Sequence, residues 1–510
     1  MHLFPECNSN TLYTLIYRKE RDIMIFYTTS SIPENSDTVI RFLAAGDEVS
    51  FADEELNSAW NPVFSNDSLT LAHKEVRSLR LPVRNSFVNL LLAGFDSSAA
   101  HPFDDFRKLS ARLGEQIKAL HSTCLYIDST DQLTFATQEQ LLTQLASILP
   151  LSEYGFDKYK SQKNSFFQVP VYVHAEANLQ PSLKEGLDIA HSVITARDLV
   201  NEIADVLTPE ELADRTSLLG KQYGFEVEIL DQEVCEKLGM GLFLAVSRGS
   251  TLPPRFLILR WKGGKPEEKP IAFVGKGITY DTGGLAIKTS SMELMNYDMN
   301  GAASVIGAMC AIAAQKLPCN VTAVIAACEN AVGSRSYRNG DIYASMSGQT
   351  VYVQNTDAEG RLSMADAITY CARHENPKEI IEIAGLTGSV CNFYGKVCAA
   401  ALTTAQPIYD RLSSLQDLTG EKYAQMPAYD EYRDLLKSPV ADLNNAPAGE
   451  PGGILAALFL DCFHDDVPFI SIDSGALPFT RSASDCQPAG ATGFGVRSLY
   501  YYVKAAVSDK

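Results

Sequence analysis

Short apolar runs recur through the second part of the chain, and stretches of helical composition separate them. Strands are expected at 256–259, 271–274, 322–327, 351–354, 380–383 and 469–472. Strands that alternate with helices are typical of a parallel or mixed sheet whose faces are covered by helices. Ligands of such sheets gather at the carboxyl ends of the strands. The pattern therefore predicts an α/β fold and indicates where a functional site should be sought.

A smaller α/β domain is predicted to precede this one, over residues 24–160. Its strands are expected at 23–27, 87–92 and 133–137, and its helices at 103–120 and 138–148. The polar stretch 161–182 is predicted to be a linker, because turn-forming residues cluster in it. The larger domain then covers 183–510 and starts with a helix over about 183–203. Residues 1–23 differ in composition and are expected to be a disordered extension.

Two carboxylates follow the strand expected at 351–354, namely Asp357 and Glu359. In an extended chain, residues two positions apart point to the same face. Neighbouring carboxylates repel each other unless a positive charge lies between them, and Arg361 follows two positions later. Such carboxylates at a strand end suit hard or borderline cations. The alternative is an acidic turn that a salt bridge to Arg361 closes.

A second charged segment follows the strand expected at 271–274, and its charges alternate in sign: Lys276, Asp281, Lys288 and Asp298. Its glycines are expected to let other backbone approach closely. Asp298 immediately precedes a helix expected over about 300–315, whose N-terminus favours a negative charge. Neither glycine-rich phosphate-binding motif is present. Surface lysines on a glycine-rich turn are the alternative explanation.

Together these segments resemble the leucyl aminopeptidases of the cytosol aminopeptidase family. The similarity covers roughly residues 185–500. The matching motifs are V-G-K-G-I-T-Y-D-T-G-G at 274–284, D-M-N-G-A-A at 298–303, N-T-D-A-E-G-R-L at 355–362, L-T-G at 386–388 and A-T-G-F-G at 491–495. The resemblance implies a metal-dependent exopeptidase that removes N-terminal, leucine-like residues from short peptides, with 183–510 as its catalytic domain.

The resemblance also implies a role for each matching residue. Two divalent ions, Mn²⁺ or Zn²⁺, would be held by five ligands: Lys276, Asp281, Asp298, Asp357 and Glu359. Lys288 would stabilise the oxyanion, and Arg361 with the backbone at Leu386 would hold a bicarbonate that serves as general base. The substrate would contact Asp298, Lys288, Met295 and Gly388. Two adjacent ions can lower the pKa of a bridging water toward neutrality.

Lysine ligates a metal only as the neutral amine, so Lys276 must lose its proton, which burial and adjacent dications both favour. None of the eight histidines lies in the motif segments. His374 is expected to cap the end of a helix over 361–371. No H-E-x-x-H zinc motif and no G-x-S-x-G nucleophile motif occurs, which argues against a hydrolase with a serine nucleophile.

Three positions depart from the family's usual pattern: Asn339 replaces a usual proline in a turn, and two others lie closer to the predicted site. Asn300 replaces a usual glycine after the Asp298-Met299 pair, and Gly385 stands where a threonine is usual. Neither change removes a predicted ligand, but both bear on the cleft for the substrate. Met295 matches a position that lines the pocket for the first side chain, where a flexible thioether suits leucine or methionine. Ordinary core packing is the alternative explanation for Met295.

The composition of the chain limits the classes of molecule that it can bind. The formal net charge of −19 argues against binding nucleic acid or anionic membranes, which relies on an excess of Lys and Arg. No transmembrane span or signal peptide is indicated, and the eleven cysteines are scattered as expected for reduced thiols, so the cytoplasm is the predicted location. The resemblance implies a homohexamer built as a dimer of trimers. A non-enzymatic scaffold on the same fold, with DNA binding, is the competing hypothesis.

Overall fold

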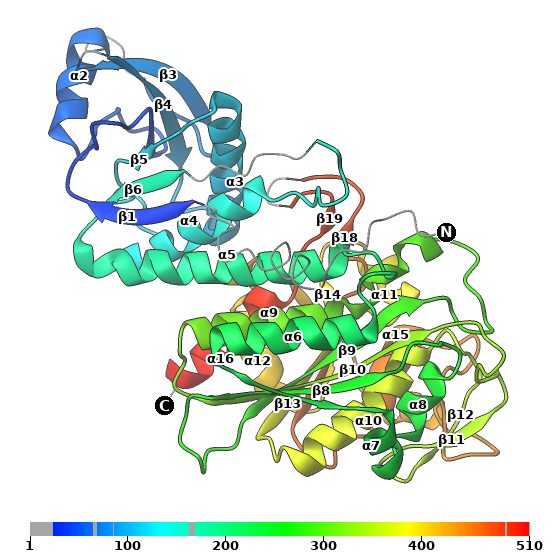
Figure 1. Cartoon of the computed structure of the whole chain (residues 1–510). Helices are drawn as coiled ribbons and strands as arrows, with labels where there is room; N and C mark the ends of the chain where they lie inside the picture. Colours follow the sequence, from blue (N-terminus) through cyan, green and yellow to red (C-terminus); the bar gives the residue numbers. More distant parts are fainter. Residues whose placement is uncertain (1–23, 65–68, 85, 163–168, 485–486, 509–510) are drawn as a thin grey trace. The chain divides into compact units, whose positions relative to one another are not determined.

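The computed structural model describes residues 24–64, 69–84, 86–162, 169–484 and 487–508 (Figure 1). The chain divides into two compact units, the first ending at Ala190 and the second beginning at His191. Each unit contains a mixed β-sheet flanked by helices, which confirms the predicted two-domain α/β class. The extension predicted over residues 1–23 lies outside the described residues. No helix in the described ranges is long and apolar enough to cross a membrane.

The first unit is built on a six-stranded sheet with the order β1-β6-β5-β2-β4-β3, in which only β3 runs antiparallel to its neighbour. Its strands are β1 (Ile25–Thr29), β2 (Thr38–Ala44), β3 (Val76–Val83), β4 (Ser86–Phe95), β5 (Leu125–Ile127) and β6 (Pro170–His174). Its helices are α2 (Glu54–Phe64), α3 (Pro102–Leu120), α4 (Gln138–Glu153) and the 3₁₀ turn η1 (Ala177–Leu179), and α5 (Gln180–Asn201) starts here and continues into the second unit.

Two predictions for the first unit are wrong. The expected linker over 161–182 contains β6, which pairs with both β1 and β5, and the start of α5. The alternating Val171 and Val173 are buried in the core, and this burial outweighs the turn-forming residues around them. The strand expected at 133–137 is a loop, because Thr137 caps α4 in a capping box with Gln140. Phe135 in that loop packs against Phe95 and Phe103.

The second unit is built on an eight-stranded sheet with the order β15-β14-β17-β13-β9-β10-β8-β7. Its strands are β7 (Glu226–Leu230), β8 (Arg255–Lys262), β9 (Ile271–Asp281), β10 (Asn320–Asn330), β13 (Glu379–Ala384), β14 (Ala399–Thr403), β15 (Tyr423–Gln425) and β17 (Phe469–Asp473). The four central strands, β17, β13, β9 and β10, are parallel to one another. Their carboxyl ends therefore meet at one edge of the sheet.

Helices cover both faces of this sheet, with α6, α9 and α16 on one side and α7, α8 and α10 on the other (Figure 1). The helices of the second unit after α5 are α6 (Pro209–Tyr223), α7 (Gln232–Lys237), α8 (Gly241–Ser247), η2 (Met292–Met299), α9 (Asn300–Ala314), α10 (Glu359–His374), α11 (Gly388–Tyr394), α12 (Gln406–Ser414), α13 (Gln416–Thr419), α14 (Asp430–Asp434), α15 (Gly452–Leu460) and α16 (Val496–Ser508). Two small sheets complete the unit: β11 (Ile342–Ala344), β12 (Thr350–Tyr352) and β16 (Leu443–Asn444), and the pair β18 (Phe479–Thr480) and β19 (Gly490–Ala491).

Strand β9 is longer than the sequence indicates. The strand expected at 271–274 continues through the glycine-rich segment to Asp281, where the alternative was a turn. The glycines serve close packing, because a Cβ at Gly275 would lie 2.6 Å from the carbonyl oxygen of Gly301. A Cβ at Gly301 would in turn lie 2.1 Å from the carbonyl oxygen of Ile383. The start of α9 therefore rests directly on the sheet, and Lys276 lies within a strand rather than in a loop.

The strand expected at 351–354 forms, as β12, but it belongs to the small three-stranded sheet. The chain then turns, and Glu359 is the first residue of α10. The side chain of Asn355 accepts a hydrogen bond from the backbone of Asp357 at 2.9 Å, which closes this turn. The prediction that Asp357 and Glu359 share a face of an extended chain is therefore wrong. The strand ends at Tyr352, and the turn that Asn355 closes comes before Asp357.

Helix α10 is anchored by a fully buried carboxylate, that of Asp366. It accepts hydrogen bonds from the backbone N–H groups of Leu242 and Phe243, both at 2.9 Å, and of Met346, at 2.7 Å. We expect Asp366→Asn to lower the free energy of unfolding by about 2 kcal/mol, because an amide nitrogen cannot accept these bonds. Urea unfolding should show a lower midpoint, whereas the exposed control Asp410→Asn should leave it unchanged.

Candidate active site

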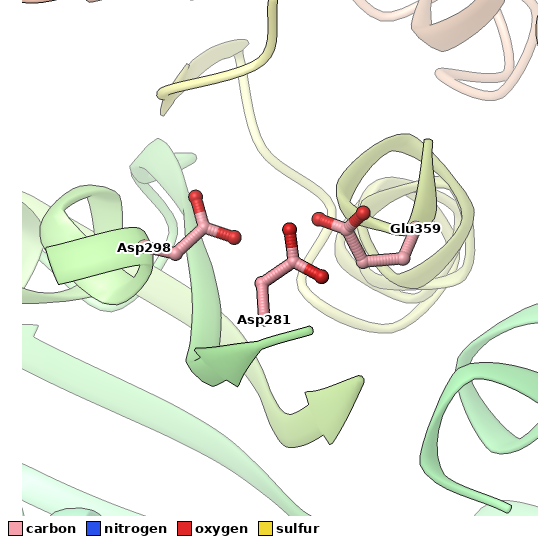
Figure 2. A group of neighbouring side chains, drawn as sticks. All are labelled: Asp281, Asp298 and Glu359. Atoms are coloured by element: carbon pink, nitrogen blue, oxygen red, sulfur yellow. The ribbon is translucent and has the colours of Figure 1, made fainter. Parts of the chain in front are cut away.

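Three buried carboxylates converge at the edge of the large sheet where the parallel strands end. Asp281 closes β9, Asp298 lies in η2 just before α9, and Glu359 opens α10. One oxygen of each lies within 4.8 Å of the others, and Figure 2 shows the three groups pointing toward one another. In the part of the chain that the structure describes, no other group of three or more His, Cys, Asp or Glu side chains is arranged in this way.

Two lysines lie among these acids. Lys276 Nζ is 2.7 Å from Asp298 Oδ2 and 2.8 Å from Glu359 Oε1. Lys288 Nζ is 2.6 Å from both Asp281 Oδ2 and Asp357 Oδ1. The structure thus brings together all five residues that the sequence proposes as ligands, and Lys288 with them.

The charges of this cluster do not balance. Four carboxylates, those of Asp281, Asp298, Asp357 and Glu359, face two ammonium groups, which leaves two negative charges in excess. The Glu359 Oε2 atom is buried and accepts no hydrogen bond from any described residue. Buried charge without a partner is costly. The donor set therefore suits cations that bind oxygen atoms.

Burial and mutual repulsion shift the protonation of the cluster. Burial first, and then repulsion by Glu359, raise the pKa of Asp281 to about 6. Burial also raises the pKa of Asp298 well above its usual value. Burial alone would lower the pKa of Lys276, but Asp298 and Glu359 outweigh it and hold that pKa well above its usual value. Without cations, the carboxylates therefore keep the proton on Lys276.

Two asparagines that the sequence analysis did not assign to the site hold its loops in place. Asn330, the last residue of β10, donates to Asp281 Oδ1 at 2.8 Å and to the carbonyl of Thr356 at 3.0 Å. Asn445 accepts from the backbone of Gln354 and donates to the carbonyl of Asn355. Asn330 ends one of the apolar strands, and a polar residue at the end of such a strand is the sequence feature that could have identified it as part of the site.

Arg361 lies in the first turn of α10, and its side chain is buried. Its Nη1 donates to the carbonyl oxygen of Asn445 at 2.6 Å, the one hydrogen bond of the guanidinium within the described ranges. Burial lowers the pKa of Arg361 to about 10. The Leu386 N–H, proposed to contact an anion beside Arg361, already donates to Asp473 Oδ1 at 3.0 Å. An anion there would have to compete with that carboxylate.

The remaining predicted residues lie on neighbouring elements. Met295 is buried in η2, three residues before Asp298, and Gly388 opens α11 in an exposed position with open space where a Cβ would lie. His374 is the last residue of α10, and its ring stacks on Tyr370 with the centroids 4.6 Å apart. His374 therefore has a structural contact and is not part of the carboxylate cluster.

The chain is similar to known proteins along most of its length. The chain is 36% identical over 465 residues to a probable cytosol aminopeptidase of Clostridium perfringens, covering 89% of this chain and 94% of that protein. It is 42% identical over 362 residues to a probable cytosol aminopeptidase of Fusobacterium nucleatum, covering 71% of this chain and 75% of the other.

Among solved structures, the chain resembles the bottromycin maturation enzyme BotP, with a TM-score of 0.80 and 27% identity over 93% of this chain and all of the other. The same enzyme has also been solved in complex with Mn. Residues 42–163 match the N-terminal domain of the cytosol aminopeptidase family, and residues 194–500 match its catalytic domain. The chain therefore belongs to the cytosol aminopeptidase family.

Proposed function

We propose that the protein is a two-metal aminopeptidase that removes leucine-like N-terminal residues from short peptides. Membership of the family supports metal-dependent aminopeptidase activity. The observation that carries the proposal further is the cluster of three buried carboxylates and the half-buried Asp357, whose two excess negative charges call for cations. Mn²⁺ and Zn²⁺ both fit a site of carboxylates and one amine, and the similar enzyme BotP has been solved with Mn.

Lys276, Asp281, Asp298, Asp357 and Glu359 would hold the two ions. When bound, such ions lower the pKa of a water held between them and so supply a nucleophile near neutral pH. Lys276 would ligate as the neutral amine. Its present proton is held there by Asp298 and Glu359, and cations placed between these groups would repel it.

Lys288 has the position of an electrophile beside the cluster. Its ammonium group contacts Asp281 and Asp357 and is only partly buried, so it can reach a substrate. Burial alone would lower the pKa of Lys288, but the attraction of nearby acids outweighs burial and raises that pKa above its usual value. The ammonium group therefore stays charged. A fixed positive charge of this kind stabilises the oxygen of the scissile carbonyl as negative charge develops on it. Asp298 would bind the free α-amine of the substrate.

Arg361 is proposed to hold a bicarbonate that accepts the proton of the attacking water. The support is a buried guanidinium in the first turn of α10 that uses one hydrogen bond to Asn445 and leaves other donors for an anion. We expect added bicarbonate to raise the activity of the wild-type protein in carbon-dioxide-free buffer several-fold. Arg361→Ala should abolish this response. Equal stimulation of both proteins would refute the role of Arg361.

We further propose that the protein works in the cytoplasm as a homohexamer, a dimer of trimers. Met295 would line the pocket for the substrate's first side chain, and Gly388 would also contact the substrate. The support is the family resemblance, together with the places of Met295 in η2 and Gly388 at the start of α11.

The exopeptidase function can be tested with one pair of peptides. Leu-Gly-Gly and its N-acetylated form should be incubated with the Mn²⁺-loaded protein, and all products (leucine, N-acetyl-leucine, glycine and the dipeptides) should be separated and measured by chromatography. The proposal expects rapid release from the free peptide and none from the acetylated one, because Asp298 requires the α-amine. Equal cleavage of both peptides, or cleavage at the internal glycine bond alone, would contradict it.

A further inference from the structure

Asn300 and Gly385 come from distant parts of the chain and meet beside the site. Asn300 opens α9 and is 3% exposed, and Gly385 follows β13. A Cβ placed on Gly385 would lie 3.2 Å from Asn300 Nδ2, closer than most real Cβ contacts. The asparagine amide therefore occupies the space into which a side chain at position 385 would project.

The Asn300 side chain also ties three segments together. Its Nδ2 donates to the carbonyl of Tyr297 at 3.0 Å, and its Oδ1 lies 3.3 Å from the hydroxyl of Ser474. That hydroxyl lies 2.9 Å from the carbonyl oxygen of Ala384. Asn300 thus connects η2, the residue after β17 and the end of β13.

The atoms fixed in this way belong to the surroundings of Lys276. The Gly385 carbonyl accepts from Lys276 Nζ at 3.2 Å, and Asp298, two residues before Asn300, contacts the same ammonium group. A shift of the 384–385 backbone or of η2 would therefore move two partners of Lys276 at once. Such shared contacts make the effects of two substitutions non-additive.

We propose that Asn300 and Gly385 are a coupled pair of positioning residues, in which the large side chain at 300 requires the absence of one at 385. The pair fixes Asp298 and the Gly385 carbonyl around Lys276, and so sets the geometry of the metal site. This inference rests on the proposed two-metal function.

The test is a cycle of four proteins: wild type, Asn300→Gly, Gly385→Thr and the double variant. Mn²⁺ binding should be measured by titration calorimetry, and kcat and KM with leucine p-nitroanilide. Each single variant should lose about tenfold in Mn²⁺ affinity, Gly385→Thr through overlap with the amide and Asn300→Gly through loss of its contacts. The double variant should lose no more Mn²⁺ affinity than Asn300→Gly alone, about tenfold rather than the hundredfold that two independent losses would give, because removing the amide also removes the overlap at position 385.

Controls keep the outcome interpretable. Asn178 is an exposed asparagine of the other unit and serves as the control. Gly385→Thr combined with Asn178→Gly should bind Mn²⁺ no better than Gly385→Thr alone. If Gly385→Thr fails to fold, the same cycle with Gly385→Ala places only the Cβ at the 3.2 Å contact. Losses that simply multiply in the double variant would overturn the pair. If losses in Mn²⁺ affinity do not multiply in the double variant but none of the four proteins cleaves the substrate, the coupling of Asn300 and Gly385 would be supported and the proposed function contradicted.

Discussion

Replacing Glu359 with glutamine should reduce kcat/KM for leucine p-nitroanilide by about a thousandfold or more, a loss of ~4 kcal/mol in transition-state stabilisation. Glu359 is 1% exposed, contacts Lys276, and shares the cluster with Asp281 and Asp298. Glutamine keeps its shape but removes one of the negative charges that cations require. Mn²⁺ affinity should therefore fall together with activity, which calorimetry on the same samples can measure.

Loss of folding must be separated from loss of metal. The unloaded Glu359→Gln protein should unfold at a lower urea concentration than the unloaded wild type, because the variant loses a buried ion pair with Lys276. The attraction of Lys276 and Lys288 outweighs burial and holds the pKa of Glu359 below its usual value, so the charged carboxylate stabilises the folded protein. Circular dichroism should show that the variant is folded under the assay conditions. Glu236→Gln, an exposed change on α7, should alter neither property. If Glu359→Gln binds Mn²⁺ and hydrolyses the substrate as wild type does, Glu359 is not a ligand.

Lys288→Ala should lower kcat by about 10²–10³-fold, as expected when a preorganised donor to a developing oxyanion is lost. Unlike the change at Glu359, it should leave Mn²⁺ binding intact or tighter, because it removes a positive charge from Asp281 and Asp357. Stopped-time assays at several substrate concentrations should show the loss in kcat, with KM changed little.

Lys288→Arg provides the conservative comparison, since it keeps the charge but changes its shape, and it should recover part of kcat. The exposed Lys265→Ala should behave as wild type. A Lys288→Ala protein with unchanged kcat but weaker Mn²⁺ binding would place Lys288 among the ligands and remove its role toward the substrate.

Much of the second unit could be predicted from its sequence because its central strands are continuous apolar runs. Such runs arise where a parallel sheet is buried on both faces, as in β9, β10, β13 and β17. The predicted ligands met because β9 ends at this edge and α9 and α10 start beside it. In the sequence, only the resemblance of their motifs to the family indicated that these residues act together.

The errors have a common physical cause, namely that tertiary contacts decided the local structure. The strand expected to end at Val274 runs to Asp281, because its glycines allow α9 to pack closely against it. Residues 350–352 form a strand as expected, yet the partner strand β16 lies far along the chain and could not be inferred from local composition. Asn330 and Asn445 hold the site through contacts with sequence separations of 49 and 90 residues. Periodicity does not reveal contacts of this kind.

Two divalent ions at the carboxylate cluster are proposed to support hydrolysis. The most direct test is to strip the protein with a chelator and titrate it with Mn²⁺ while following leucine p-nitroanilide hydrolysis and bound metal together. We expect no hydrolysis by the stripped protein, and activity that rises with added Mn²⁺ and levels off at two bound ions per chain. Full hydrolysis by protein shown to carry no metal would contradict it.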